Sequence, residues 1–339
     1  MSDPLAADEI IAGLLANLPP GARHRLSQQL LRAAVDLVQQ QPEILDLKIA
    51  SSALEEMGDA FAMFAPSLGT PKVTIFGSAR TQEHDPLYAA ARTVAAALAA
   101  QGWMVVTGAG PGIMQAGMEG AGREHSIGVS VRLPFEQGAN HIIAGDSKYV
   151  SMKYFFTRKL MLIKESKGFV CLPGGFGTLD ETFELLTLTQ TGKGVPVPIV
   201  FLDTPGDPYW ETVHEFVQNQ LVQRGLVAPG DTSLYLITED CDRAVQEIVG
   251  FYRNYDSLRY VGNTLVVRMR RAPTAEQLQV LNDRFGHLCM SGTIHLADPF
   301  DPERKENDRL DLQRIALPFS KHGYGELREL IDVLNTYVD

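Results

Sequence analysis

Short apolar segments alternate with helix-like segments from Pro71 onward, and this alternation leaves few folds open to the chain. The expected strands are Val73–Phe76, Trp103–Thr107, Ile127–Val131, Phe169–Leu172, Ile199–Leu202 and Leu234–Ile237. The expected helices are 86–101, 112–123, 148–165, 179–191, 208–224 and 239–253. Buried strands joined through helices of this length are typical of βαβ units in a parallel sheet. The pattern predicts an α/β fold with a doubly wound parallel sheet, which binds its ligand at the carboxyl ends of the strands.

Two further segments flank this α/β region. The first 70 residues read as helices, because apolar residues recur at helical spacing in two runs: Ile10, Ile11, Leu14, Leu15 and Leu18, then Leu26, Leu30, Leu31, Val35 and Val38. Pro19-Pro20 and Pro42 end these runs, which fit packing helices or an oligomer contact.

The segment after residue 253 reads as β-α-β-β-α, a small α+β module. Its expected elements are Leu265–Met269, Thr274–Phe285, Thr293–Leu296, Arg314–Leu317 and a helix from Gly325, with a charged loop at 298–309. We therefore expect three parts: an N-terminal helical extension (1–70), the α/β domain (71–253) and the C-terminal module (254–339).

Composition excludes several classes of function. The chain has 30 Lys and Arg against 41 Asp and Glu, a net charge of −11, which argues against a nucleic-acid partner. Its three cysteines form no CxxC, and its eight histidines show no HxxxH or HExxH spacing, so we expect no metal. The acidic start and the absence of a long apolar run predict a cytoplasmic protein with no membrane partner.

A first glycine-rich loop, Thr107-Gly108-Ala109-Gly110-Pro111-Gly112-Ile113, follows the second expected strand. It differs from the dinucleotide fingerprint, because Ile113 stands at the third glycine position. Gly108, Gly110 and Gly112 would allow an anionic or ribosyl ligand to approach the backbone at a helix N-terminus. A tight turn without a ligand is the alternative interpretation.

A second loop, Pro173-Gly174-Gly175-Phe176-Gly177-Thr178-Leu179-Asp180-Glu181, leaves a strand and opens a helix. Gly174, Gly175, Gly177 and Thr178 can offer N–H and hydroxyl groups to a phosphate. Because the Gly-Lys-Ser/Thr of a triphosphate loop is missing, a monophosphate fits better. Glu181 could reach a bound sugar or only complement the helix dipole.

The basic pair Arg158-Lys159 lies on the helix before this loop. Such a pair most often lies on a solvated face, but its place directly before the loop also fits a role beside the ligand.

Together these segments resemble the LONELY GUY (LOG) family of nucleotide phosphoribohydrolases, over residues 71–253. The family pattern P-G-G-x-G-T-x-x-E matches residues 173–181 at every fixed position, and the R-K pair matches Arg158-Lys159. The segments Gly108–Ala116 and Gly77-Ser78-Ala79-Arg80 resemble the family's first glycine loop and its opening motif.

The resemblance implies a Rossmann-like domain that hydrolyses the N-glycosidic bond of nucleoside 5′-monophosphates of the AMP or N6-modified (cytokinin) type. Glu181 would stabilise the positive ribose, Arg158 would neutralise the phosphate or polarise the departing base, and Lys159 would support Arg158. The phosphate would lie on Gly174, Gly175, Gly177 and Thr178. Ser78, Glu136 and Thr187 would be further substrate contacts.

The resemblance also implies a homo-oligomer that needs no cofactor. Family members have been labelled lysine decarboxylases, a label we reject because the context that pyridoxal phosphate chemistry needs is missing. The alternative function is a nucleotide-binding carrier or sensor without catalysis. Gln115 replaces the family's Glu, and both flanks lie outside the compact family pattern. Longer relatives act on unmodified purine and pyrimidine monophosphates, and the C-terminal module could gate such a site.

Overall fold

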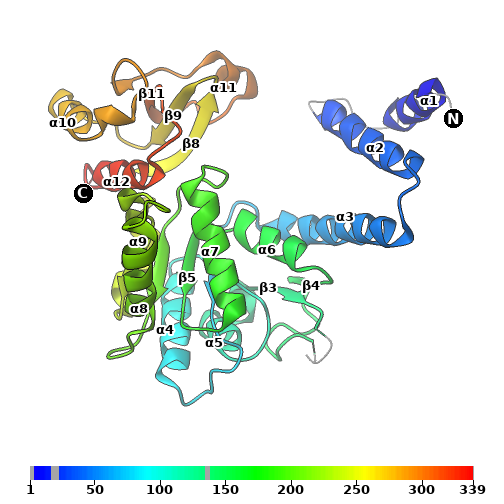
Figure 1. Ribbon diagram of the computed structural model, residues 1–339, viewed down its shortest axis with the longest axis horizontal. Coiled ribbons are helices and arrows are strands. Elements are labelled where there is room, and N and C mark those ends of the chain that lie inside the picture. Colours follow the sequence, from blue (N-terminus) through cyan, green and yellow to red (C-terminus); the bar gives the residue numbers. More distant parts are fainter. Residues whose placement is uncertain (1–3, 17–22, 134–137, 339) are drawn as a thin grey trace. The chain divides into compact units, whose positions relative to one another are not determined.

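The computed structural model describes residues 4–16, 23–133 and 138–338 (Figure 1). The chain divides into two compact units, Met1–Asp59 and Ala60–Asp339, and each is described by itself. None of the helices in these ranges is long and apolar enough to cross a membrane.

The first unit is helical, as predicted. It contains α1 (Pro4–Ala16), α2 (Arg23–Gln39) and most of α3 (Ile44–Phe64), and α1 packs against α2. Ile11 and Leu15 of α1 are buried, whereas Leu26 and Leu30 of α2 remain exposed. The expected helix end at Pro19-Pro20 lies outside the described residues.

A seven-stranded parallel sheet forms the core of the second unit and confirms the predicted α/β fold. The strand order is β4-β3-β2-β1-β5-β6-β7, and every neighbouring pair is parallel. The strands are β1 (Lys72–Phe76), β2 (Met104–Thr107), β3 (Ser126–Val131), β4 (Tyr149–Met152), β5 (Gly168–Cys171), β6 (Ile199–Leu202) and β7 (Leu236–Thr238). All six predicted strands are present within a few residues.

Helices cover both faces of this sheet (Figure 1). One face shares a single apolar core with α4 (Pro86–Ala100), α5 (Ile113–Ala121) and α9 (Cys241–Gly250). The other face carries α6 (Phe155–Lys164), α7 (Phe176–Gln190) and α8 (Tyr209–Phe216). Strand alternation explains the division: Val200 and Leu202 join the first core, while Phe201 points the other way and stacks on Trp210 of α8.

The prediction of one helix over 148–165 was wrong. The segment begins as strand β4, which pairs with β3 from Gly128↔Tyr149 to Val131↔Met152, and α6 starts only at Phe155. Because β4 is a four-residue edge strand with only Met152 fully buried, it carries no apolar run that would reveal it. Two smaller differences concern the helices expected over 179–191 and 208–224. Helix α7 begins earlier, at Phe176, and α8 passes into a π-helix at Val217–Val222.

The C-terminal segment forms a four-stranded antiparallel sheet in the order β10-β11-β9-β8. Its elements are β8 (Tyr255–Val261), β9 (Thr264–Met269), α10 (Ala275–Phe285), β10 (His295–Leu296), α11 (Asp301–Glu306), β11 (Gln313–Leu317) and α12 (Tyr324–Asn335). The predicted β-α-β-β-α order missed β8, which forms a hairpin with β9, and α11, which lies in the expected loop. A separate domain over 254–339 stays a prediction, because this sheet belongs to the same compact unit as the parallel sheet.

Helix α12 attaches the C-terminal module to the parallel-sheet part. Gly325 lies so close to the segment Pro229–Leu234 that a Cβ there would be 1.9 Å from the carbonyl oxygen of Gly230. Arg328 of α12 forms an ion pair with Glu247 of α9. The interface therefore requires a glycine at its closest point and is held by charge at its edge.

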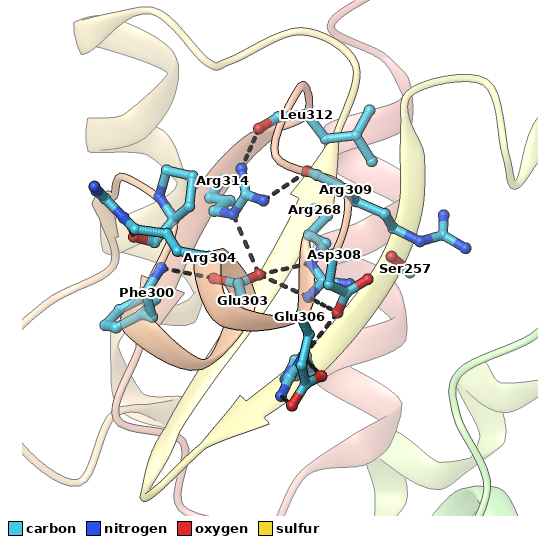
Figure 2. A network of polar contacts seen from close by, with 12 residues as sticks. Ser257, Arg268, Phe300, Glu303, Arg304, Glu306, Asp308, Arg309, Leu312 and Arg314 are labelled. Carbon is cyan, nitrogen blue, oxygen red and sulfur yellow. Dashed lines mark hydrogen bonds and ion pairs between the residues drawn. The ribbon is translucent and has the colours of Figure 1, made fainter. Parts of the chain in front are cut away.

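A buried network of charges fixes α11 on the sheet of the C-terminal module (Figure 2). Arg268 of β9 and Arg314 of β11 are directly opposite each other, an arrangement that like charges normally destabilise. Glu303 of α11 is completely buried, and its Oε1 accepts bonds from Arg268 Nη2 at 2.7 Å and Arg314 Nε at 3.3 Å. Although burial opposes ionisation, hydrogen bonds from the Phe300 N–H and the arginines hold the pKa of Glu303 below its usual value.

Replacing Glu303 by glutamine would leave Arg268 and Arg314 without their shared counter-charge. We expect the free energy of unfolding, measured by urea denaturation, to fall by about 3–5 kcal/mol, as for other broken buried ion pairs. Glu306→Gln, at the exposed end of the same network, is the matched control and should change stability much less. Equal losses in the two variants would contradict the importance of burial.

Candidate active site at the carboxyl edge of the parallel sheet

The strand order creates one natural binding position in the parallel sheet. From β1 the chain proceeds through β2, β3 and β4 on one side and returns to β5 on the other side of β1. At such a switch point the loops after the two central strands diverge and leave a crevice at their carboxyl ends. Gly77-Ser78 follows β1, and Pro173-Gly174 follows β5.

Backbone hydrogen bonds join three loops around this crevice. Ser78 N donates to Pro173 O at 3.3 Å, and Ile113 N donates to Ser78 O at 3.0 Å. Gly112, the residue before α5, has a φ of 67° and lies against the same loop: a Cβ there would be 2.3 Å from Ser78 O. Gly112 therefore allows the two loop backbones to pack closely, and it does not line the cleft where a ligand would bind.

The loops enclose a cleft of about 860 Å³. Eight of the predicted site residues line it: Ser78, Gly108, Arg158, Gly174, Gly175, Gly177, Thr178 and Glu181. Gly110, Gly112, Lys159 and Thr187 do not line it, and Glu136 lies outside the described residues. The structure thus brings together the two motifs, although they come from separate parts of the chain.

The second glycine loop forms the N-terminus of α7. Gly175 precedes the helix, and no side chain among the described residues caps its first N–H groups, so these groups are available to an anion. A Cβ on Gly174 would lie 2.2 Å from Thr178 Oγ1, whereas a Cβ on Gly175 or Gly177 would meet nothing within 4 Å. Gly174 is therefore needed for packing, and the other two glycines leave space open on the cleft side.

Glu181 and Arg158 form a buried ion pair in the cleft. Arg158 Nη1 lies 3.0 Å from Glu181 Oε1, with 12% and 10% of the side chains exposed. Arg158 Nε also donates to the carbonyl of Val129 at 3.2 Å, which orients the guanidinium from the side of β3. Burial raises the pKa of Glu181 above its usual value, and the charge of Arg158 acts in the opposite direction.

Three other residues singled out from the sequence point elsewhere. Lys159 pairs with Asp180 and Glu184 on α7; burial opposes its charge, but hydrogen bonds to these carboxylates raise its pKa. Thr187 is exposed and donates back to Phe183 O within α7. Gln115, at the family's Glu position, donates to Glu119 on α5 and does not line the cleft.

Sequence reasoning missed several residues that line the cleft, notably Arg80, Met114, Phe155, Phe176 and Tyr209. Phe176 occupies the variable position of the glycine motif and is 92% exposed. Phe155 lies three residues before Arg158, so helical spacing could have indicated it. Tyr209 donates its hydroxyl proton to Gly174 O at 2.7 Å, and no local sequence signal marks that long-range contact.

The described residues contain no group of three or more His, Cys, Asp or Glu side chains that could hold a metal ion. Their cleft instead combines a helix N-terminus with a carboxylate and a guanidinium. A doubly wound sheet with these groups at its switch point defines a Rossmann-like α/β protein with a candidate anion-binding cleft.

Sequence comparisons agree with this class. Residues 111–248 match a family model described as "Possible lysine decarboxylase". The chain is 28% identical over 167 residues to a cytokinin riboside 5′-monophosphate phosphoribohydrolase of Mycobacterium marinum, covering 48% of this chain and 86% of that protein. It is 32% identical over 108 residues to the probable phosphoribohydrolase LOG6 of Arabidopsis thaliana, covering 32% of this chain and 51% of that protein. These matches confirm the resemblance to the LOG family.

Among solved structures, the molybdenum cofactor carrier protein of Chlamydomonas reinhardtii is similar with a TM-score of 0.37 and 20% identity. That alignment covers 53% of this chain and 98% of the carrier protein.

Gly112→Ala tests how the loops are held together. The positive φ would add about 1–2 kcal/mol of strain, and the close Ser78 carbonyl would add about 1–3 kcal/mol more. We expect urea denaturation to show a loss of about 2–5 kcal/mol in the free energy of unfolding. Gly250→Ala, at the end of α9 with no atom within 4 Å of the added Cβ, is the control. A Gly112→Ala protein as stable as the wild type would refute this role.

Proposed function

We propose that the protein hydrolyses the N-glycosidic bond of nucleoside 5′-monophosphates, releasing the base and ribose 5-phosphate. The bases considered are adenine and its N6-modified forms. The observation that carries the proposal is the buried Glu181–Arg158 pair one helical turn from the glycine-rich N-terminus of α7. The names of the relatives in Mycobacterium marinum and Arabidopsis thaliana support the same reaction.

The reaction needs a carboxylate at a defined distance from the phosphate. Glu181 follows Thr178 by three residues, an axial rise of about 4.5 Å along α7. A phosphate on the first N–H groups of α7 would therefore place the attached ribose beside this carboxylate. As the glycosidic bond breaks, positive charge develops on the ribose, and an ionised Glu181 stabilises it and orients the attacking water.

Arg158 has two functions in this mechanism. Its charge favours the ionised form of Glu181, which burial alone would disfavour. Its remaining N–H groups can donate to the phosphate or to the departing base. The wall formed by Met114, Val131 and Leu133 offers an apolar surface for the planar base.

The alternative function is a carrier or sensor that binds a nucleotide without cleaving it. Binding alone gains nothing from a buried carboxylate whose pKa burial raises, because the ionised group must first be stabilised by Arg158. The pair therefore favours catalysis over binding alone.

We further propose that the protein is a cytoplasmic homo-oligomer. Phe155, Phe156 and Leu160 on α6 and Phe176 on α7 are large apolar side chains that remain about half or more exposed in the single chain. A second subunit that covers them would remove this apolar surface from water.

Glu181→Gln tests the proposed chemistry directly. Incubation with AMP, GMP, CMP, UMP and N6-isopentenyl-AMP, with chromatographic detection of base and ribose 5-phosphate, should show at least about a hundredfold lower kcat in the variant. Glu215→Gln, which removes an exposed carboxylate from α8, is the control and should keep full activity. Equal turnover by Glu181→Gln and the wild type would exclude the mechanism; tight AMP binding without turnover in the wild type would favour a carrier.

The pH dependence of kcat should reflect the raised pKa of Glu181. Because the ionised carboxylate is the active form, kcat should fall as the pH drops through a value above 4.5, the ordinary glutamate pKa. Arg158→Met should move this acid limb of the residual activity to higher pH, because the lowering influence of the guanidinium is lost. An unchanged acid limb would contradict the coupling.

A further inference from the structure

The charged side chains that line the cleft leave one positive charge after the Arg158–Glu181 ion pair is subtracted. Among the described residues, the charged side chains of the lining are Arg80, Arg158 and Glu181. Arg158 and Glu181 neutralise each other at 3.0 Å. Arg80 therefore contributes the net positive charge of the described lining.

The guanidinium of Arg80 has no ion-pair partner in the described part of the chain. Only its backbone groups form described bonds: its N–H donates to Ser78 Oγ at 3.1 Å, and its carbonyl accepts from Gln82 Nε2 at 2.9 Å. Lys159, by contrast, is not available to a ligand in this way, because its ammonium group forms ion pairs with Asp180 and Glu184. Arg80 is exposed, and no described residue takes up any of its five side-chain N–H donors, which can therefore serve a ligand.

The backbone places Arg80 beside the N-terminus of α7. Ser78, two residues earlier, donates its N–H to Pro173 O, and a Cβ on Gly174 would lie only 3.1 Å from Ser78 N. The bond from Arg80 N–H to Ser78 Oγ turns the chain immediately after this contact. The β1 loop thus brings an unpaired guanidinium to the cleft, while the β5 loop brings uncapped N–H groups.

We propose that Arg80 binds the 5′-phosphate together with the N–H groups at the α7 N-terminus and selects phosphorylated nucleotides over unphosphorylated nucleosides. The proposal rests on the proposed function, since it assigns a specificity residue to that reaction. Arginine suits this role because its planar fork can form two parallel hydrogen bonds to one phosphate. A nucleoside would make no use of this contact, so the affinity for its ribose and base would not depend on Arg80.

The test compares AMP with adenosine in the wild type, Arg80→Met, Arg80→Lys and the control Arg92→Met, which removes an exposed arginine of α4 outside the cleft lining. In Arg80→Met, kcat/KM for AMP should fall about ten- to a hundredfold, the usual effect of losing a hydrogen bond to a charged group. The kcat/KM of Arg80→Met for adenosine should change less than about twofold, which corresponds to less than about 0.4 kcal/mol. Arg80→Lys should recover part of the loss, and Arg92→Met should show none.

Calorimetric binding to the Glu181→Gln protein, with and without Arg80→Met, gives a readout that does not require turnover. The Kd of AMP and of ribose 5-phosphate should rise by the same factor that kcat/KM falls, and the Kd of adenosine should stay constant. Equal effects on AMP and adenosine, an unchanged Kd for AMP, or no binding of either phosphate compound to the parent would overturn the role of Arg80. If the wild type cleaves no nucleotide but its AMP affinity depends on Arg80, the proposed function fails while the phosphate contact stands.

Discussion

Two backbone hydrogen bonds of a single residue hold the candidate site together. Ser78 donates to Pro173 after β5 and accepts from Ile113 at the start of α5, so the loops after three strands meet at one point. Glycines at 77, 112 and 174 allow the close approach, because a Cβ at these positions would meet the Ile113 side chain, the Ser78 carbonyl oxygen and the Thr178 side chain respectively. The loops are thus joined through their backbones, and the candidate reactive side chains reach the cleft from α6 and α7.

The Glu181–Arg158 pair shows how a neighbouring guanidinium can favour the ionised form of a buried carboxylate. Burial alone favours the neutral acid, which neither stabilises a cation nor orients water. A fully exposed carboxylate would be ionised, but water would weaken its field. The guanidinium of Arg158, held by the carbonyl of Val129, opposes this effect of burial and favours the ionised carboxylate.

The sequence predicted the parallel sheet and eight of the residues that line the cleft, because both depend on local patterns. Apolar runs marked six of the seven strands, and the motif 173–181 marked the N-terminus of α7. Strand β4 was not predicted, because it forms through its pairing with β3 at the edge of the sheet and its own residues carry no apolar run. Tyr209 reaches the cleft through a long-range hydrogen bond, and the pairing of Lys159 with two acids depends on how α6 lies on α7; neither contact has a local signature.

Helix α7 contacts different neighbours at its two ends. Its first turns carry Thr178 and Glu181, while Gln190 at its last turn donates to Asp231 at 2.6 Å. Gly192, just beyond the helix, abuts Tyr324 of α12 so closely that a Cβ would be 1.9 Å from the tyrosine hydroxyl oxygen. Inserting or deleting one residue in α7 would rotate one end relative to the other by about 100° and shift it by about 1.5 Å. The contacts at its two ends therefore fix the length of α7.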